Sequence, residues 1–222
     1  MADSEKDILL KISQAASRIS NLNRLLKTSV RISAQALGVD HCSIWLADDE
    51  RKFFKIKAVY VKGRSSPVHL GSRIVLSRFP KFKRIITEKR TVHFPDISKA
   101  ITYRFEKEFF TKAKIKSFLS VPLKLRGKVL GTLNFGTLKH YRTFTASEKR
   151  IAQIIANQTA VGIENSKLYQ ELEERSAQLQ EQSYKVLRES EEKYRTLLEN
   201  LPQMIFTRSI SKNWILKNIK VE

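Results

Sequence analysis

The stretch SFLSVPLKLRGKVLGTLNFG, residues 117–136, contains two apolar runs separated by the short basic sequence RGK. A glycine-bearing break of this length between two β-prone runs is typical of a hairpin with a tight turn. The spacing predicts two adjacent strands whose side chains alternate between two faces. The second run holds Gly131 and Gly136 but lacks the residue order of a phosphate-binding loop, so we expect these glycines either to relieve crowding within a strand or to permit a bend.

Helix-like and strand-like patterns lie on both sides of the hairpin. Apolar residues that recur every three or four positions indicate helices, and alternating apolar residues indicate strands. The order predicts an α+β fold in which terminal helices pack on one face of an antiparallel sheet. The predicted elements are a helix at 4–37 that ends before Gly38, strands at 41–50 and 52–61, a short helix at 79–90, a short strand at 91–97, a helix or loop at 98–114, the hairpin, and a long helix from 145.

Two local patterns refine these elements. Thr145 and Glu148 have the spacing of a capping box at the start of the last helix. In the second strand, a period of two predicts one shared face for alternate residues. These residues are Phe54, Ile56, Ala58 and Tyr60.

The last predicted helix is long and poor in apolar residues. No helix breaker separates Gly162 from Pro202, so one helix of about 50 residues is expected, ending at Asn200 before a short strand. In its later part, apolar residues recur only once per heptad, and the second core position of each heptad is polar. This pattern favours a weak coiled coil over an isolated helix. The apolar series is Leu172, Leu179 and Val186, and the alternate sites are Arg175, Gln182 and Glu189.

The net charge of +20 is concentrated in the middle of the chain. Residues 51–150 hold 26 Lys and Arg residues against five Asp and Glu residues. Such a field attracts anions, including nucleic acid, anionic lipid or an acidic protein. No nucleic-acid-binding motif accompanies the charge, so nucleic-acid binding through 51–150 is kept only as an alternative.

Composition and motifs exclude several classes of function. No nucleophile elbow, P-loop or zinc-protease motif occurs, so we expect no enzymatic activity from this chain. The four His residues are dispersed, and Cys42 is the one cysteine, so neither a metal site nor a disulfide is expected. No signal peptide or apolar run long enough to span a bilayer is recognisable, so a cytoplasmic protein without a membrane span is predicted.

Three blocks of the sequence resemble a GAF domain in their order and spacing. They are GVDHCSIWLADDE, SFLSVPLKLRGKVLGTLNF and YRTFTASEKRIAQIIANQTAVGIENSKLYQEL, and together they cover about residues 20–171. The later sequence SEEKYRTLLENLP is similar to the first helix of a PAS domain. The resemblance implies four parts: the start of a dimerisation helix at 1–19, a GAF domain at 20–171, a helical coiled-coil linker at 172–190 and a truncated PAS start at 191–222.

The resemblance also implies a function. GAF–helix–PAS arrays stand upstream of histidine kinases, diguanylate cyclases and transcription factors; the GAF domain binds a small molecule or dimerises, and the long helix carries the signal. We therefore expect a sensory module of a two-component or related signalling system. The alternatives are a ligand-free dimerisation or docking domain whose basic face binds an acidic partner, and nucleic-acid binding.

In the family the ligand pocket lies on the sheet face away from the terminal helices. The ligand is unidentified, and the basic charge favours an anion. The cyclic-nucleotide signature is incomplete, because Phe144 is present but Glu148-Lys149 replaces its Asp-Glu pair. Haem is not expected, and bilin is not either, since Cys42 lies in a strand whereas the bilin-linking cysteine of the family lies in a loop. The expected ligand-binding residues are Trp45, Tyr60, Arg73, Tyr103, Phe105, Phe118, Ser120, Thr132 and Asn134; the alternative is that these aromatic residues only fill the core.

The terminal helices of GAF dimers commonly pair with their copies. Both ends of this chain carry apolar stripes, so a homodimer is expected. The expected interface residues are Ile12, Ile19, Leu26, Ile154, Val161, Leu168 and Leu172.

Overall fold

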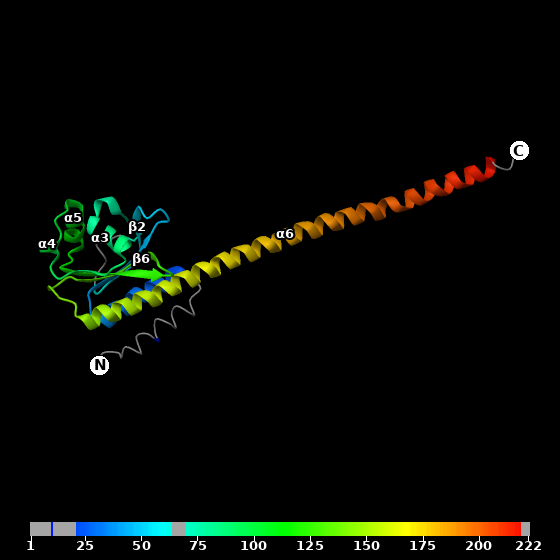
Figure 1. Ribbon diagram of the computed structural model, residues 1–222. Helices are drawn as coiled ribbons and strands as arrows, with labels where there is room; N and C mark the ends of the chain where they lie inside the picture. Colours follow the sequence, from blue (N-terminus) through cyan, green and yellow to red (C-terminus); the bar gives the residue numbers. More distant parts are fainter. Residues whose placement is uncertain (1–9, 11–20, 64–69, 219–222) are drawn as a thin grey trace. The chain divides into compact units, whose positions relative to one another are not determined.

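A computed structural model of the chain describes residues 10, 21–63 and 70–218, with side chains up to Asn200 (Figure 1). Its centre is a six-stranded antiparallel sheet in the order β3-β2-β1-β6-β5-β4. The strands are β1 (His41–Ala47), β2 (Phe53–Val61), β3 (Arg73–Val75), β4 (Val92–Phe94), β5 (Ser117–Leu125) and β6 (Lys128–Thr137). The predicted α+β fold class is confirmed.

Helices cover both faces of this sheet (Figure 1). The helix α2 and the first part of α6 pack on one face, which we call the terminal-helix face. The helices α3, α4 and α5 cover the other, which we call the aromatic face. The helical segments are α2 (Leu22–Leu37), the 3-10 turn η1 (Leu76–Arg78), α3 (Pro80–Glu88), α4 (Ile97–Ala100), α5 (Arg104–Ala113) and α6 (Ala146–Asn218). The expected stop of α2 is confirmed, because Gly38 takes the left-handed conformation, with φ of 59°, that favours glycine.

The hairpin β5–β6 has the predicted tight turn, but the turn is two residues long, because Lys128 belongs to β6 and not to the turn as predicted. Leu125 pairs with Lys128, and the two residues between them, Arg126 and Gly127, have φ angles of 46° and 76°. Two consecutive left-handed residues match the right-handed twist of the flanking strands. Alternate residues of the hairpin then face opposite sides of the sheet, with Leu119 on the terminal-helix face and Phe118 on the aromatic face.

Gly131 lets β6 approach β1 closely. A Cβ atom on this residue would overlap the carbonyl oxygen of Trp45 and lie 2.8 Å from the Cα of Leu46. Because both contacts are with the backbone, no side-chain rotation relieves them. The expectation that glycine relieves crowding in this strand is confirmed at Gly131.

A polar connection joins the start of α6 to the end of α2. The predicted capping box forms: the backbone N–H of Thr145 donates to Oε2 of Glu148 (2.8 Å), and the N–H of Glu148 donates to Oγ1 of Thr145 (3.2 Å). The guanidinium of Arg142 bonds the other carboxylate oxygen of Glu148 and donates to the carbonyl oxygen of Leu37 (3.0 Å). These contacts hold the start of α6 against the end of α2.

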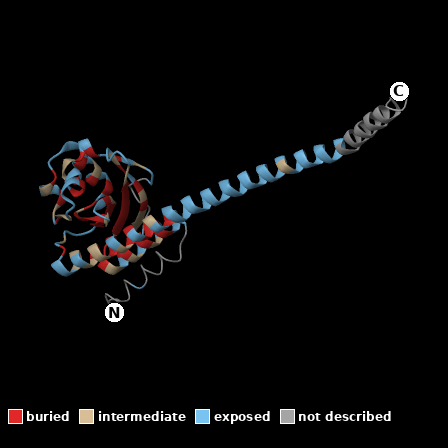
Figure 2. Ribbon diagram, turned by 45° about the vertical axis from the view of Figure 1, so that its right-hand side comes forward, coloured by how far each residue is buried: buried red, intermediate tan, exposed pale blue. Residues whose placement is uncertain are grey.

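The chain divides into two compact units, with the boundary between Gln170 and Glu171. The second unit is the later part of α6, and almost all of its described side chains are exposed (Figure 2). The predicted helix end at Asn200 and the strand after it are wrong, because α6 continues to Asn218. A strand in this segment would have no neighbouring strand within the described part of the unit, so its backbone N–H and C=O groups would lack hydrogen-bond partners. In the helix that forms instead, these groups bond one another.

No helix in the described part of the chain combines the length and apolar character needed to cross a membrane.

Candidate functional site

A cluster of aromatic rings fills the space between the sheet and helices α3 and α5. Phe118 of β5 lies 4.9 Å from Phe110 and 5.6 Å from Phe82 between ring centroids. Most of these rings meet edge-on or tilted, the arrangement aromatic pairs prefer. The aromatic cluster consists of Trp45, Phe54, Phe79, Phe82, Phe94, Phe109, Phe110 and Phe118.

Trp45 lies at the centre of the aromatic cluster. Its ring centroid is 5.6 Å from both Phe82 and Phe109 and 6.1 Å from Phe118. The indole is buried, yet its Nε1–H has no hydrogen-bond acceptor among the described residues. Phe109 is only half-buried, so its ring is the part of the cluster over Trp45 that solvent reaches.

A fully buried polar network lies on the same face of the sheet. Ser120 Oγ donates to Oδ1 of Asn134 (2.6 Å), and Asn134 Nδ2 donates to Oγ1 of Thr132 (3.1 Å) and to the carbonyl oxygen of Ser43 (3.3 Å). The hydroxyl of Ser43 is buried beside them without a described partner. The network thus leaves one free hydroxyl on this face.

Glu106 brings a carboxyl group into the helix layer of the same site. Its Oε1 accepts a hydrogen bond from the backbone N–H of Lys81 (3.1 Å) in the first turn of α3, while Oε2 is buried without a described partner. Burial raises the pKa of Glu106, although the backbone N–H and the charge of Lys81 and the backbone N–H of Phe82 oppose the shift. The carboxyl therefore links α5 to α3 and keeps one oxygen for another partner.

Five of the predicted ligand-binding residues come together on the aromatic face. Their placement follows from strand alternation on β1, β5 and β6, which the sequence already indicated. The five are Trp45, Phe118, Ser120, Thr132 and Asn134, and all are buried.

Tyr60 and Arg73 lie elsewhere. The pairing of β1 with β2 shifts register, so Ile44 opposes Ala58 whereas Trp45 opposes Ile56. This bulge turns Ala58 and Tyr60 toward the terminal-helix face, so the prediction of one shared face along β2 is wrong beyond Ile56. Arg73 is exposed, and its guanidinium lies 4.7 Å from the ring centroid of Phe53.

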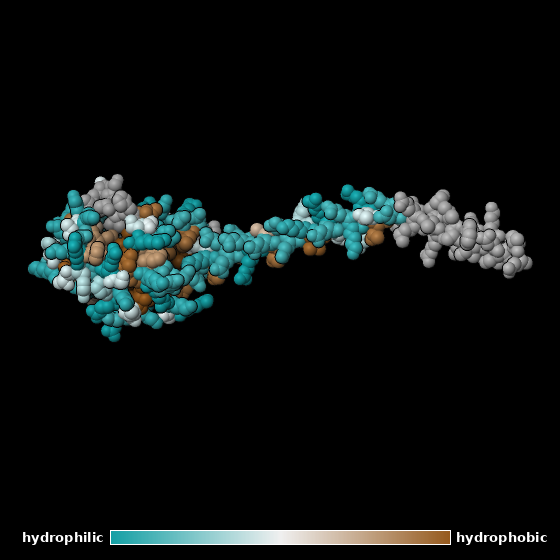
Figure 3. Space-filling model, turned by 90° about the horizontal axis from the view of Figure 1, so that it is seen from above, coloured by the Kyte–Doolittle hydropathy of each residue, from teal (hydrophilic) through white to brown (hydrophobic). Residues whose placement is uncertain are grey.

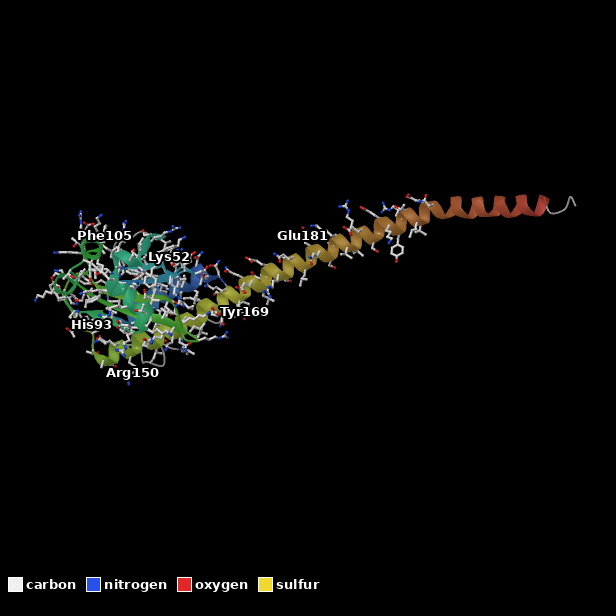
Figure 4. The ribbon with its side chains drawn as sticks, turned by 45° about the horizontal axis from the view of Figure 1, so that its top comes forward. Lys52, His93, Phe105, Arg150, Tyr169 and Glu181 are labelled. Carbon is white, nitrogen blue, oxygen red and sulfur yellow. The ribbon has the colours of Figure 1, made fainter. Side chains whose placement is uncertain are left out.

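Tyr103 and Phe105 lie on the surface of the helix layer. They are 50% and 46% exposed, and the guanidinium of Arg78 lies 4.8 Å from the centroid of the Phe105 ring. Phe105 is labelled at the outside of the domain in Figure 4. The inner face of α5 is instead formed by residues at positions i, i+3, i+4 and i+7. These are Glu106, Phe109, Phe110 and Ala113, and their spacing is the signal that would have identified Phe109 and Phe110.

The predicted dimer residues are divided between core and surface. Leu26 is fully buried in the core of its own domain, so its assignment to an interface is wrong: its face of α2 packs on the sheet. Val161, Leu168 and Leu172 of α6 are exposed, and Ile154 is half-buried. Ile12 and Ile19 lie outside the described residues.

Cys42 and His93 are both engaged away from the aromatic cluster. Cys42 is buried on the terminal-helix face, and this burial raises its pKa. His93 Nε2 accepts a hydrogen bond from the backbone N–H of Phe144 (3.2 Å), just before α6. Burial and the nearby charge of Lys149 lower the pKa of His93. Among the described residues, no three His, Cys, Asp or Glu side chains gather as metal ligands would.

A model of the GAF domain family matches residues 21–163. Similar solved structures include the GAF domain of an Acinetobacter phosphoenolpyruvate-protein phosphotransferase, with 23% identity, a TM-score of 0.61, and coverage of 76% of this chain and 97% of that one. The phycocyanobilin-bound GAF domain of a cyanobacterial phytochrome has 18% identity, a TM-score of 0.64, and coverage of 76% and 98%. A methyl-accepting chemotaxis protein, residues 122 to 287, has 19% identity, a TM-score of 0.61, and coverage of 71% and 97%. No curated protein matches the chain.

Proposed function

The chain belongs to the GAF domain family, and on that premise we propose that its domain senses a small molecule bound between the sheet and helices α3 and α5. GAF domains are sensory modules of signalling proteins such as chemotaxis receptors and phytochromes. The proposed module is dimeric and passes the signal on through α6.

The observation that carries the proposal is a set of buried polar atoms on the aromatic face that have no hydrogen-bond partner within the described part of the chain. They are Nε1 of Trp45, Oγ of Ser43 and Oε2 of Glu106. Native proteins pair the great majority of buried polar atoms, because an unpaired one costs about 1–3 kcal/mol. Polar groups of a bound molecule would satisfy these atoms, and the surrounding rings would supply the apolar walls that small-molecule sites have.

The unpaired atoms define the chemistry of the proposed ligand. The Trp45 N–H donates only, so the ligand presents an acceptor to it. A flat molecule suits the aromatic walls, and a negatively charged acceptor agrees with the basic charge of residues 51–150. To admit such a molecule, the half-buried Phe109 ring moves away from Trp45.

The strand β6 offers a short route from this site to α6. Asn134 lies on the aromatic face, while its neighbours Leu133 and Phe135 pack on the terminal-helix face with Ile155 and Ala156 of α6. A displacement of β6 by a ligand therefore changes the packing of α6 directly. The exposed Val161, Leu168 and Leu172 are the proposed contacts with the second copy, beside the half-buried Ile154.

Native mass spectrometry of the full chain tests ligand binding. The protein is incubated with the small-molecule fraction of a cell extract, and we expect one non-covalent adduct per subunit. Trp45→Phe keeps an aromatic ring but removes the N–H, so it should weaken the adduct about threefold to tenfold, in line with the loss of one hydrogen bond. Phe105→Leu, on the outside of the helix layer, is the control. An adduct equally strong in both variants, or none in the wild type, contradicts the proposal.

A further inference from the structure

The first part of α6, residues 146–170, is the part that packs on the sheet. Its buried residues Ala152, Ile155 and Ala156 belong to the core of the terminal-helix face. Beyond Gln170 almost all described side chains of α6 are exposed, and Figure 3 shows that segment as mainly hydrophilic with scattered apolar side chains. The contacts at the start of α6 therefore contribute directly to its attachment to the domain.

The edge strand β4 reaches both the aromatic cluster and the start of α6. Among the described strands, β4 pairs with β5. Phe94 lies in the aromatic cluster, with its ring centroid 6.3 Å from that of Phe82. The preceding residue, His93, meets the Phe144 ring edge-on on the other side of the sheet, with 5.5 Å between centroids. Figure 4 labels His93 and Arg150, an early residue of α6, at the same end of the domain.

A hydrogen bond joins His93 to the backbone that leads into α6. The N–H of Phe144 donates to Nε2 of His93 (3.2 Å). Phe144 is buried, and Thr145 directly after it caps the helix. A ring nitrogen accepts a hydrogen bond only when it carries no proton, so this contact requires a neutral ring with its proton on Nδ1.

The groups around the ring disfavour its protonated form. Burial and the charge of Lys149 on α6 lower the pKa of His93, whereas a hydrogen bond with the backbone of Arg142 opposes this shift. The carboxylate of Glu148 on α6 is already bonded by the guanidinium of Arg142. From β5, the residue opposite His93 is the apolar Leu119. A proton on this ring therefore meets a positive charge and no free carboxylate among these neighbours.

A second link from this edge of the sheet to α6 does not depend on protonation. The hydroxyl of Thr91, just before β4, donates to Oε1 of Gln153 (3.4 Å). Nε2 of Gln153 donates in turn to the carbonyl oxygen of Pro122 in β5 (3.3 Å). None of these three groups titrates near neutral pH. A change at His93 thus acts on the backbone just before α6, while the helix keeps its place on the sheet.

We propose that His93 is a proton-binding site that controls the start of α6: a proton from solvent, taken up at Nε2, breaks the hydrogen bond to Phe144 and loosens residues 143–145. The ring is half-buried, so solvent protons reach it. Loss of the proton to solvent frees the lone pair of Nε2 and restores the bond. Acidity is thereby an input separate from the proposed small-molecule site, and the two inputs meet in β4, where Phe94 follows His93.

Nuclear magnetic resonance of the full chain with isotope-labelled histidine tests the state of the ring. At neutral pH we expect His93 to be uncharged with its proton on Nδ1, and to titrate below the ordinary pKa of histidine, about 6.5. The spectrum of His93→Gln identifies its signals among those of the four histidines. An uncharged ring with its proton on Nε2 overturns the proposal, because such a ring cannot accept from Phe144.

Amide hydrogen exchange tests the effect on α6. After correction for the intrinsic pH dependence of exchange, the Phe144 amide should lose protection about threefold to tenfold between neutral pH and a pH at which His93 is protonated, in line with the loss of one hydrogen bond. His93→Gln supplies an acceptor that does not titrate, so its Phe144 amide should stay protected at both pH values. His140→Gln is the matched control, because His140 is exposed in the connection between β6 and α6, and it should respond like the wild type.

The outcomes separate local release from acid unfolding. A loss of protection at Phe144 that spares β5 and β6 and is absent from His93→Gln supports the proposal. An equal loss across the whole domain, or no loss at Phe144 while His93 takes up its proton, overturns it. A response that persists in His93→Gln assigns the effect to another group and overturns it as well. Ligand binding is measured at neutral pH, so the proposed function and this inference can fail independently.

Discussion

Replacing Asn134 by Ala should destabilise the domain through its buried polar network. The change removes three hydrogen bonds, from Ser120 (2.6 Å), to Thr132 (3.1 Å) and to the carbonyl oxygen of Ser43 (3.3 Å). Each bond contributes about 1 kcal/mol, and the partners stay buried without replacements. We therefore expect the free energy of unfolding to fall by about 3 kcal/mol, which lowers Tm by about 6–12 °C in a chain of this size.

Thermal and urea unfolding of the purified chain, followed by circular dichroism, measures this loss. Asn157→Ala on α6 is the matched control, because Asn157 is exposed and its side chain accepts only from Gln153. The control should change stability by less than about 0.5 kcal/mol. If Asn134→Ala lowers the free energy of unfolding by less than about 1 kcal/mol, or by no more than the control does, the buried polar network does not stabilise the domain as argued.

Three further changes probe other parts of the domain. Gly131→Ala should lower the free energy of unfolding, measured in urea, by about 2–3 kcal/mol, because the added Cβ meets backbone atoms. The control Gly136→Ala should lower it by less than about 1 kcal/mol. Equal effects of the two changes would contradict the close approach of β6 to β1. The pKa of His93 is lowered in the folded chain, so the neutral form of its ring favours folding. The stability that this group contributes is fully present above the ordinary pKa of His. It is lost as the pH falls through the lowered pKa of the folded chain. Unfolding measured between pH 7.5 and 5 should therefore show a smaller loss for His93→Gln than for the wild type, and an unchanged profile refutes this role. Arg142→Ala should cost about 2 kcal/mol in thermal unfolding, because it breaks charged hydrogen bonds to Glu148 and to the end of α2, and Tm within 2 °C of the wild type would contradict that link.

The hairpin and the start of α6 could be predicted because their signals are local. A two-residue turn and strand alternation place Phe118 and Asn134 on the face opposite to Leu133. The spacing of Thr145 and Glu148 is itself the capping motif. Such features depend on near neighbours in sequence, so no tertiary information is needed.

Other parts of the site depend on contacts that sequence spacing does not contain. A one-residue bulge opposite Ile44 and Trp45 moves Tyr60 to the other face, and this bulge arises where two strands meet. Glu106 lies in a helix rich in charged residues, so composition gave no indication that this side chain would be buried against the first turn of α3. Phe109 and Phe110 share a helical spacing with Glu106 and Ala113 that indicates the inner face, whereas Tyr103 and Phe105 do not fit this spacing and lie on the surface.

Hydrogen–deuterium exchange, measured with and without the small-molecule fraction of a cell extract, tests the central claim most directly. A ligand between the sheet and the helix layer should slow exchange in α5 (Arg104–Ala113) and β6 (Lys128–Thr137), and should change exchange in residues 146–170 of α6. Trp45→Phe should reduce these changes. Exchange that stays unchanged in all three segments, or that changes only at exposed surface loops, would contradict a sensory site on the aromatic face.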